Sequence, residues 1–418
     1  MNRWIICLAG TGINLVLGVL YSWSIFVVPL QEKFGWSRAD LTWPFSVSIL
    51  VFAVVMVAAG KWQDKVGPRL VATVGGVLMG LGYILSGFVS SLPALIFTFG
   101  VIAGAGVACG YVTPIAATVK WFPDKRGLAT GIAVSGFGFG AFVFTPLARK
   151  LIVAVGVMTA FKVLGVIFLI IVVALAQLLR DPPPGWKPEG WEPPAPSETK
   201  TMATEKDWTL GEAIKTWSFW SLWLAFLGNA GVGLMVISLI APLAKTLGIS
   251  QETAAFLIGF LSIFNGFGRI LAGWLSDVIG RRAAMLVFFS VTTLMCVVMA
   301  FTNIAGTTLG YALALMVFGA SYGSNFALFP AATADYFGTK NLGNIYAGVF
   351  TAWGFAGFVG PRFIKARLLK TIPKKLVAQG MPKEQANLVA YKTAFKVAIG
   401  LGLLAVFMAF LTRAPKED

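Results

Sequence analysis

Long apolar stretches recur along the chain, and short polar segments separate them. A stretch of about 18 apolar residues, as a helix, crosses a hydrocarbon core roughly 30 Å thick. The first stretch is too long for a signal peptide and lacks a convincing cleavage site, so we interpret it as a span. The pattern predicts an all-α membrane protein with twelve transmembrane helices, at residues 5–30, 41–60, 70–90, 93–120, 127–152, 158–180, 216–245, 253–275, 283–303, 306–335, 342–364 and 393–412.

The two halves of the chain resemble each other. The segment Gly60–Arg69 has the form Gly-x-x-x-Asp-x-x-Gly-x-Arg, and this form recurs in Gly273–Arg282, half a chain length later. Pro114 and Pro330 continue the match at nearly the same offset. An offset near half the chain length is typical of parallel repeats about an axis along the membrane normal. We therefore expect two pseudo-symmetric six-helix bundles.

A polar stretch rich in proline joins the halves. It contains seven prolines together with Trp186 and Trp191, a composition that favours extended surface chain. We expect an N-terminal bundle over residues 1–180, a central cytoplasmic loop over 181–213 and a C-terminal bundle over 214–418.

The composition agrees with lipid as the solvent and narrows the chemistry. The chain is 57% hydrophobic and 12% charged, with a mean hydropathy of +0.82, which no soluble protein of this size sustains. There is no histidine, and Cys7, Cys109 and Cys296 all fall inside apolar stretches. These thiols are expected to pack rather than to form disulfides or bind metal. We expect no cofactor, no metal and no enzyme, because the spans carry no nucleophile–base pair or carboxylate pair.

The net charge of +16 predicts topology rather than a nucleic-acid partner, because most Lys and Arg residues lie in short segments between spans. Nine of them follow even-numbered spans and about six lie in the opposite short loops. This bias favours cytoplasmic termini and a multi-pass protein of the cell inner membrane, embedded in the bilayer as a monomer. Residues 365–392, with seven Lys or Arg residues, run against the rule; an amphipathic surface helix is one interpretation.

Arg269 is the one ionisable side chain well inside a predicted span that we take as functional. Inserting a guanidinium costs on the order of 3 kcal/mol, so it is kept where it faces a cavity and meets an anion. Its planar fork suits a carboxylate, with two parallel hydrogen bonds. Ser262, Asn265 and Arg269 share one helical face with Gly266. The alternative is that Arg269 snorkels to the cytoplasmic interface.

Aromatic side chains are candidates for the rest of such a cavity. Phenolic hydroxyls can contact the second end of a small ligand, while the rings form an apolar box. For any single one, helix packing or lipid contact is an equally good explanation. The candidates are Tyr21, Tyr111, Tyr322, Tyr346 and Trp353.

The repeated motif predicts a conformational latch. Its glycines allow a tight turn between spans, and its aspartates can cap a neighbouring helix or pair with arginine. The candidate gating residues are Asp64, Arg69, Asp277, Arg281 and Arg282.

The doubled motif resembles the signature of the major facilitator superfamily. Tyr21-Ser-Trp-Ser24, Asn265-Gly-Phe-Gly-Arg269 and the Pro183–Trp191 stretch resemble bacterial oxalate/formate antiporters, and Lys125–Ile132 resembles the monocarboxylate transporters. The resemblance covers nearly the whole chain except residues 365–392. It implies the major facilitator fold and a bacterial monocarboxylate transporter homologue. It also implies Arg269 as the carboxylate ligand, with Tyr21, Tyr111, Tyr322 and Asn265 lining the site.

Two positions depart from these families. The oxalate antiporters have a lysine where this chain has Trp353, and proton-coupled monocarboxylate transporters have an acid where it has Asn265. One buried cation instead of two favours a monocarboxylate such as L-lactate over oxalate. The second departure leaves the proton site open: the substrate can enter as an acid with its own proton, or an acid at the edge of the site, such as Asp277 or Asp335, can bind it.

The expected function is proton-coupled symport of a small carboxylate by alternating access about a midplane site. Carboxylate exchange of the oxalate/formate type is the alternative within carriers. A receptor built on a carrier fold is the alternative from another class, and it would bind its ligand without flux.

Overall fold

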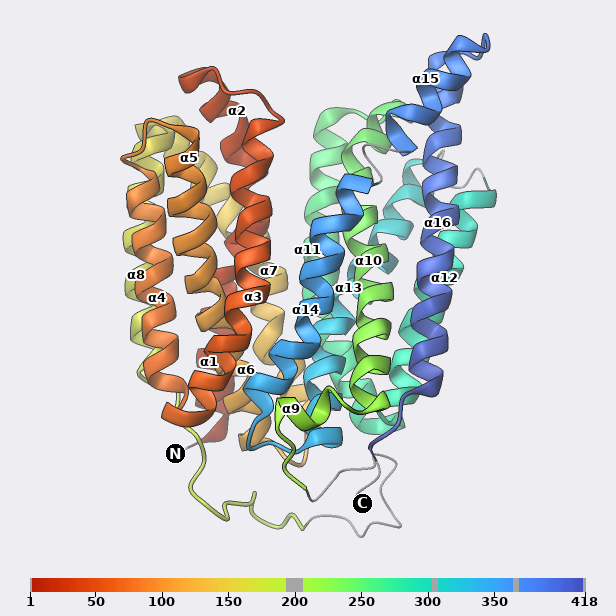
Figure 1. Ribbon diagram of the computed structural model, residues 1–418. Helices are drawn as coiled ribbons and strands as arrows, with labels where there is room; N and C mark the ends of the chain where they lie inside the picture. The colour runs from red at the N-terminus through yellow and green to blue at the C-terminus, as the bar shows by residue number, and fades with distance from the viewer. Residues whose placement is uncertain (1, 193–205, 303–306, 364–367, 416–418) are drawn as a thin grey trace.

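The computed structural model describes residues 2–192, 206–302, 307–363 and 368–415, and the described part is helical without strands. Two helical bundles stand side by side, and both chain ends lie at the same end of the molecule (Figure 1). We call this end the terminus face and the opposite end the distal face. The described residues between α8 and α9, 177–192 and 206–209, also lie at the terminus face.

Each bundle contains six long helical segments. In the N-terminal bundle, the first and fourth segments are composite. They are α1 (Arg3–Leu17) with a 3-10 turn (Gly18–Ser22) and α2 (Ser24–Phe34); α3 (Trp43–Val66); α4 (Pro68–Ser86); α5 (Leu92–Leu95) with a π-helical stretch (Ile96–Ala103) and α6 (Gly104–Trp121); α7 (Arg126–Val155); and α8 (Val157–Ala176). The C-terminal bundle holds α10 (Trp217–Thr246), α11 (Gln251–Ile279), α12 (Arg281–Phe301), α13 (Thr308–Phe337), α14 (Leu342–Phe363) and α16 (Lys383–Leu411). Two short helices, α9 (Leu210–Ala213) and α15 (Thr371–Ala378), lie at opposite ends of the molecule.

The repeated motif forms two equivalent joints. Gly67 separates α3 from α4 at φ 86°, and Gly280 separates α11 from α12 at φ 92°. Residues with a Cβ rarely adopt this left-handed region, so glycine permits a one-residue turn between antiparallel helices. Each joint connects the second long helical segment of its bundle to the third, so the two bundles have the same turn at this point.

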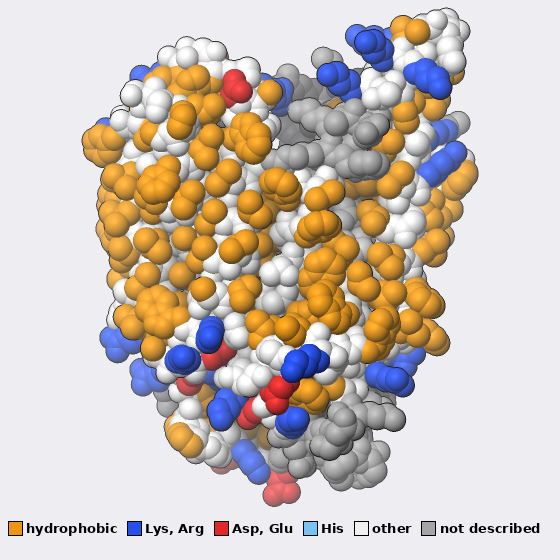
Figure 2. Space-filling view, in the orientation of Figure 1, with side chains coloured by type: hydrophobic (Ala, Val, Ile, Leu, Met, Phe, Trp, Pro, Cys, Tyr) orange, Lys and Arg blue, Asp and Glu red, His pale blue; other side chains and the backbone are white. Residues whose placement is uncertain are grey.

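The expected twelve-span fold is confirmed. Among the described residues, eleven helices are long and apolar enough to cross a membrane. The twelfth is α11, which has 29 residues and packs between α7 and α13. Apolar side chains form a belt across the middle of the face shown in Figure 2. The acidic side chains on this face lie mainly near the terminus face. This distribution matches a protein solvated by lipid around its middle.

Two predicted boundaries were wrong. The first span is not one continuous helix, because the 3-10 turn at Gly18–Ser22 interrupts it where Gly18 packs directly against the backbone of Gly140 in α7. The last helix begins at Lys383 rather than at 393. Its first turns are good helix formers but polar, so hydropathy does not detect them. The described part of the basic segment 365–392 forms α15 and the start of α16, while residues 365–367 lie outside the described residues.

Contacts between the bundles are made mainly by two helix pairs, α7 with α11 and α3 with α14. Small residues allow the backbones to meet. A Cβ atom at Gly60 would collide with the carbonyl oxygen of Gly343, and one at Gly273 would collide with that of Gly127. Close backbone contact of this kind is the usual way in which membrane helices pack tightly. Between these pairs lies a buried cluster of polar and aromatic side chains, which we call the chamber: Arg269, Asn265, Tyr21, Tyr111, Tyr322, Tyr346 and Trp353.

Candidate functional site

Arg269 lies between the two bundles and not at the membrane interface. Its side chain is 0% exposed. The Nε atom donates to Asn265 Oδ1 at 3.0 Å, one helical turn earlier, and Nη1 donates to the carbonyl oxygen of Val134 in α7 at 2.8 Å. The snorkelling alternative therefore does not describe this structure, because snorkelling requires the charged group to reach water.

Among the described residues, the guanidinium has no counter-charge within ion-pair distance. No described carboxylate lies within 4.0 Å of it, and its Nη2 atom is buried without a hydrogen-bond partner. Beyond its two carbonyl acceptors, the guanidinium lies over aromatic faces, with the ring centres of Phe326 and Phe137 at 4.3 and 5.7 Å from the guanidinium carbon. An unpaired buried cation is energetically costly. A bound anion at this position would supply the missing charge.

Four tyrosines surround Arg269 and form two pairs, each with one member from each bundle. The hydroxyls of Tyr21 and Tyr322 are 3.2 Å apart, and Trp353 Nε1 donates to the Tyr322 hydroxyl at 2.7 Å. The hydroxyls of Tyr111 and Tyr346 are near neighbours, and the Tyr111 hydroxyl also lies beside the guanidinium. Neither of these two hydroxyls makes a hydrogen bond of ordinary geometry. Two phenols and one guanidinium nitrogen therefore have unused hydrogen-bonding capacity in one small space.

The two tyrosine pairs occupy different depths along the membrane normal. Tyr346 lies in the first turns of α14, close to the terminus face, whereas Tyr322 lies midway along α13. Tyr21 is deeper still, in the 3-10 turn beyond the distal end of α1. Arg269 lies between these levels, a few turns before α11 ends at the terminus face. The pair of Tyr21 and Tyr322 thus lies on the distal side of Arg269, and the other pair reaches toward the terminus face.

The structure brings all seven predicted site residues into this chamber. Six are nearly fully buried, and Tyr21 is partly buried. Sequence reasoning missed the phenylalanines that complete the walls. Phe52 and Phe350 stack near Tyr111 and Trp353, and Phe137 and Phe326 cover the guanidinium. With 34 phenylalanines in the chain, apolar periodicity alone could not single out these four.

The predicted latch residues Asp64 and Asp277 each cap a helix of the other bundle. Asp64 accepts hydrogen bonds from the backbone N–H groups of Gly343 and Asn344, at 3.1 and 2.8 Å, at the start of α14. Asp277 accepts from Gly127 and Leu128, at 2.9 and 2.8 Å, at the start of α7. A carboxylate at a helix N-terminus also interacts favourably with the helix dipole. The two latches close the terminus face symmetrically.

Charge pairs reinforce one of the two latches. Arg281 contacts Asp277 at 2.6 Å and Asp335 at 2.7 Å, and Asp335 also pairs with Arg126 of the other bundle at 2.6 Å. Two members of the predicted gating set lie elsewhere. Arg69 donates to Gln177 within the N-terminal bundle, and Arg282 lies over the Phe410 ring within the C-terminal bundle. The side chains of Arg69 and Arg282 therefore contact their own bundles and not the partner bundle.

Replacing Gly60 by alanine should open the terminus face. The added methyl group would collide with the Gly343 backbone, and overpacking costs about 1–3 kcal/mol. The cost falls only on the closed arrangement, so we expect longer distances between spin labels at Lys61 and Lys340, measured by double electron–electron resonance. Gly400→Ala is the matched control, because a Cβ at Gly400 meets nothing within 4 Å. An unchanged distance distribution for Gly60→Ala would contradict this role.

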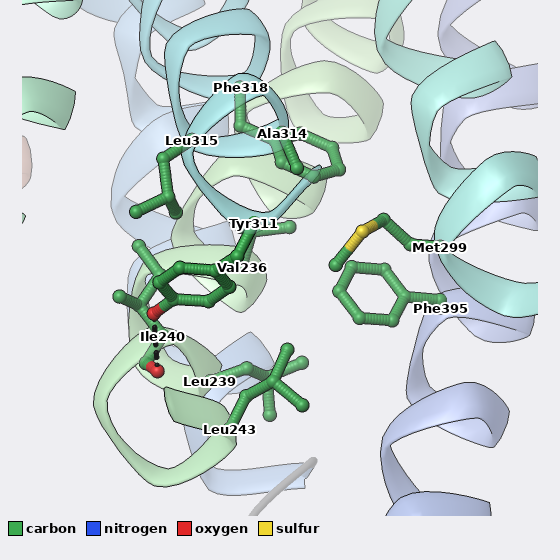
Figure 3. Close-up of a pocket in the computed structure, with 10 residues that line it drawn as sticks. All are labelled: Val236, Leu239, Ile240, Leu243, Met299, Tyr311, Ala314, Leu315, Phe318 and Phe395. Carbon is green, nitrogen blue, oxygen red and sulfur yellow. Dashed lines mark hydrogen bonds between the residues drawn. The ribbon is translucent and has the colours of Figure 1, made fainter. Parts of the chain in front are cut away.

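A separate small cavity lies within the C-terminal bundle, and Arg269 is not among the residues that line it (Figure 3). Its volume is about 10 Å³, near the minimum that one water molecule needs. Apolar side chains of α10, α12, α13 and α16 line it, and its one phenol, Tyr311, already donates to the Ile240 carbonyl oxygen at 2.7 Å. This cavity is a packing defect without the polar groups of a substrate site.

Two six-helix bundles that meet at a buried cluster of polar and aromatic side chains are the architecture of a membrane transporter. The sequence profile of the Major Facilitator Superfamily matches residues 6–361. The oxalate:formate antiporter of Oxalobacter formigenes is 32% identical over 364 residues, covering 86% of this chain and 84% of the relative. Monocarboxylate transporter 13 of Bos taurus is 29% identical over 336 residues, covering 80% and 74%. The solved structure of the proton:xylose symporter XylE has a TM-score of 0.68 at 13% identity, covering 95% and 94%.

The chain belongs to the Major Facilitator Superfamily. It is a transporter, not an enzyme, and it is related to the oxalate:formate antiporter and to the monocarboxylate transporters.

Proposed function

We propose that this transporter carries small monocarboxylates such as L-lactate across the membrane, together with a proton, by alternating access. The observation that carries the proposal is the buried, unpaired guanidinium of Arg269. A substrate carboxylate would pair with its free Nη2 atom, and the Tyr111 and Tyr346 hydroxyls would donate to the same anion. The names of the relatives, which include an oxalate:formate antiporter and monocarboxylate transporters, support the same substrate class.

The chamber favours a substrate with one carboxylate and a small, partly apolar body. Within the described chamber Arg269 is the cation, and phenylalanine and tryptophan rings form the opposite walls. A second carboxylate would meet these apolar walls without a counter-charge, which is strongly unfavourable. A hydroxyl such as that of lactate has partners in the Tyr21 and Tyr322 phenols.

A lysine in place of Trp353 should shift the preference toward dicarboxylates. Its ammonium group would add a second positive charge within the chamber. We expect oxalate affinity to rise by at least about tenfold and lactate affinity to fall, since one charge pair is worth a few kcal/mol when desolvated. Competition of unlabelled oxalate against labelled lactate uptake measures both. Trp353→Gln, which removes the ring without adding charge, should not gain oxalate affinity.

Substrate and proton would act at different places. The carboxylate would neutralise Arg269 and so lower the free-energy cost of burying this charge during reorientation, since an uncompensated charge resists desolvation. The proton would bind an acid at the edge of the chamber, Asp277 or Asp335, and weaken the latch at the terminus face. Each ligand would remove one of the two barriers to reorientation, which couples their movement.

Exchange of carboxylate anions is the second candidate function. Asn265, a neutral amide, is the chamber side chain that faces Arg269 most directly, and the relative at 32% identity is an antiporter by name. In this case the empty carrier, with its uncompensated guanidinium, would reorient slowly. Only bound anion would then cross in either direction.

Purified protein in proteoliposomes separates these functions. With labelled L-lactate outside and no substrate inside, an inward proton gradient drives accumulation if the carrier is a symporter. An exchanger accumulates label only when unlabelled carboxylate is loaded inside. Lactate binding without flux in either format would exclude a transporter of this substrate and favour a sensor.

We also propose an oligomeric state, a location and a topology for the protein. They are a monomer in the cell inner membrane, cytoplasmic termini, bundles over residues 1–180 and 214–418, and a central loop over 181–213. The common end of both termini in Figure 1 is consistent with this topology. Labelling of introduced cysteines in intact cells with a membrane-impermeant maleimide would test the orientation.

A further inference from the structure

A basic helical hairpin projects from the distal face. It comprises residues 368–396, which include α15, the turn after it and the first turns of α16. Glu384 is its one acid, and its basic residues are Lys370, Lys374, Lys375, Lys383, Lys392 and Lys396. In Figure 2 the blue side chains at the upper right cover this part of the molecule.

The hairpin has a defined structure. Gly380 adopts φ 90° and donates its N–H to the Val377 carbonyl oxygen, and Met381 donates to that of Leu376. These bonds end α15 in a left-handed turn. Pro382 then caps the start of α16, where its fixed φ suits a helix boundary. The buried Pro373 holds α15 against the bundle. The lysines are thus presented on a fixed scaffold.

The hairpin begins at the distal edge of the apolar surface. Lys396 places its ammonium 5.3 Å from the centre of the Phe301 ring, and Phe301 is itself 64% exposed on the apolar belt. From this level α16 extends several further turns toward the distal side, back to its start at Lys383. There α15 returns along it (Figure 1). Lysines of the hairpin therefore extend from the edge of the hydrocarbon across the headgroup layer.

None of the ion pairs within the described part of the chain involves Lys370, Lys374, Lys375 or Lys383 of the hairpin. The five ion pairs within the described part of the chain all lie at the terminus face, where acids are interspersed with bases. Lys370, Lys374, Lys375 and Lys383 are exposed and share one acid nearby. Like charges at this density repel one another unless an anionic layer lies close.

We propose that this hairpin is a docking surface for anionic phospholipid headgroups, such as phosphatidylglycerol, in the leaflet at the distal face. A cluster of lysines on an amphipathic helix next to a membrane span is the usual chemistry of such recognition. The position favours lipid over the carried substrate, because α15 packs on α16 at the outer edge of the C-terminal bundle, away from the helices that line the chamber. The role is independent of which substrate is carried.

Photocrosslinking of the full-length protein in mixed liposomes tests this surface. The probe is phosphatidylglycerol with a photoactivatable headgroup, and mass spectrometry quantifies its yield on peptides from residues 368–396. We expect strong labelling that falls by about fivefold or more in a variant with Lys370, Lys374, Lys375 and Lys383 changed to glutamine. A control with Lys61, Lys65, Lys187 and Lys215 changed to glutamine should retain full labelling of the hairpin, because those side chains are exposed at the terminus face.

Four outcomes test the proposal and the source of the anion. Equal labelling by a matched phosphatidylcholine probe, or unchanged labelling in the hairpin variant, would overturn the proposal. Competition by millimolar inorganic phosphate would instead indicate a site for free anions and would also overturn it. Loss of labelling in the wild-type protein at about 1 M salt is the expected result for a screened electrostatic contact.

Discussion

Replacing Arg269 by methionine should abolish carboxylate binding while leaving the protein folded. Removing one partner of a desolvated charge pair costs about 2–5 kcal/mol, a loss of at least roughly 30-fold in affinity. Methionine fills much of the same volume, and it removes a buried charge that has no counter-ion in the empty chamber. We therefore expect the melting temperature without substrate to stay the same or to rise. Lactate uptake and thermal unfolding of the same preparation measure the two effects.

The charge-preserving variant Arg269→Lys is the control for this prediction. Lysine keeps one positive charge but lacks the planar fork that donates two parallel hydrogen bonds. It should retain weak binding, between the wild type and Arg269→Met. Wild-type uptake by Arg269→Met would remove Arg269 from the site, and a strongly lowered melting temperature would mean that the guanidinium is structural.

Replacing Asp335 by asparagine should strongly destabilise the closed terminus face. Asp335 is buried and bridges Arg281 of its own bundle and Arg126 of the other. Its removal leaves both guanidinium groups with less counter-charge in a desolvated site, which typically costs about 3–5 kcal/mol. We expect a lower melting temperature and a loss of proton-driven accumulation of lactate.

The exposed Asp40 offers a matched comparison for this variant. Asp40→Asn changes the same chemistry at the distal face, where Asp40 contacts Ser37 rather than an arginine. Its effect on stability should stay below about 1 kcal/mol. If Asp335→Asn and Asp40→Asn shifted the melting temperature equally, the proposed role of the Arg126–Asp335–Arg281 bridge would be wrong.

The sequence was sufficient for the fold because two strong signals agreed. Apolar stretches fix the number of spans, and the motif at Gly60–Arg69 and Gly273–Arg282 fixes the symmetry. The sequence-based prediction was wrong where the helix limits depend on local packing and on polar residues. Hydropathy reports transfer to lipid, so it could not detect the polar start of α16 at Lys383 or the 3-10 turn at Gly18–Ser22.

In the candidate site too, some residues could be predicted from the sequence and others could not. Arg269 could be found because an ionisable group inside a span is rare and costly. The motif suggested Arg69 and Arg282 as gating residues, yet only the packing of each helix decides which side chains face the other bundle. Asp335 was identified as an edge acid, but its bridge to Arg126 joins residues far apart in the chain, which no local pattern specifies.

The central claim is that a substrate carboxylate supplies the charge that Arg269 lacks. Its most direct test compares L-lactate with lactamide, which has nearly the same shape but no charge, as stabilisers of the purified wild-type protein. At about 100 times its dissociation constant, a ligand specific for the folded state adds roughly 2.7 kcal/mol of stability. The account predicts a clear rise in melting temperature with lactate and little change with lactamide. Equal stabilisation by both compounds, or by neither, would contradict it.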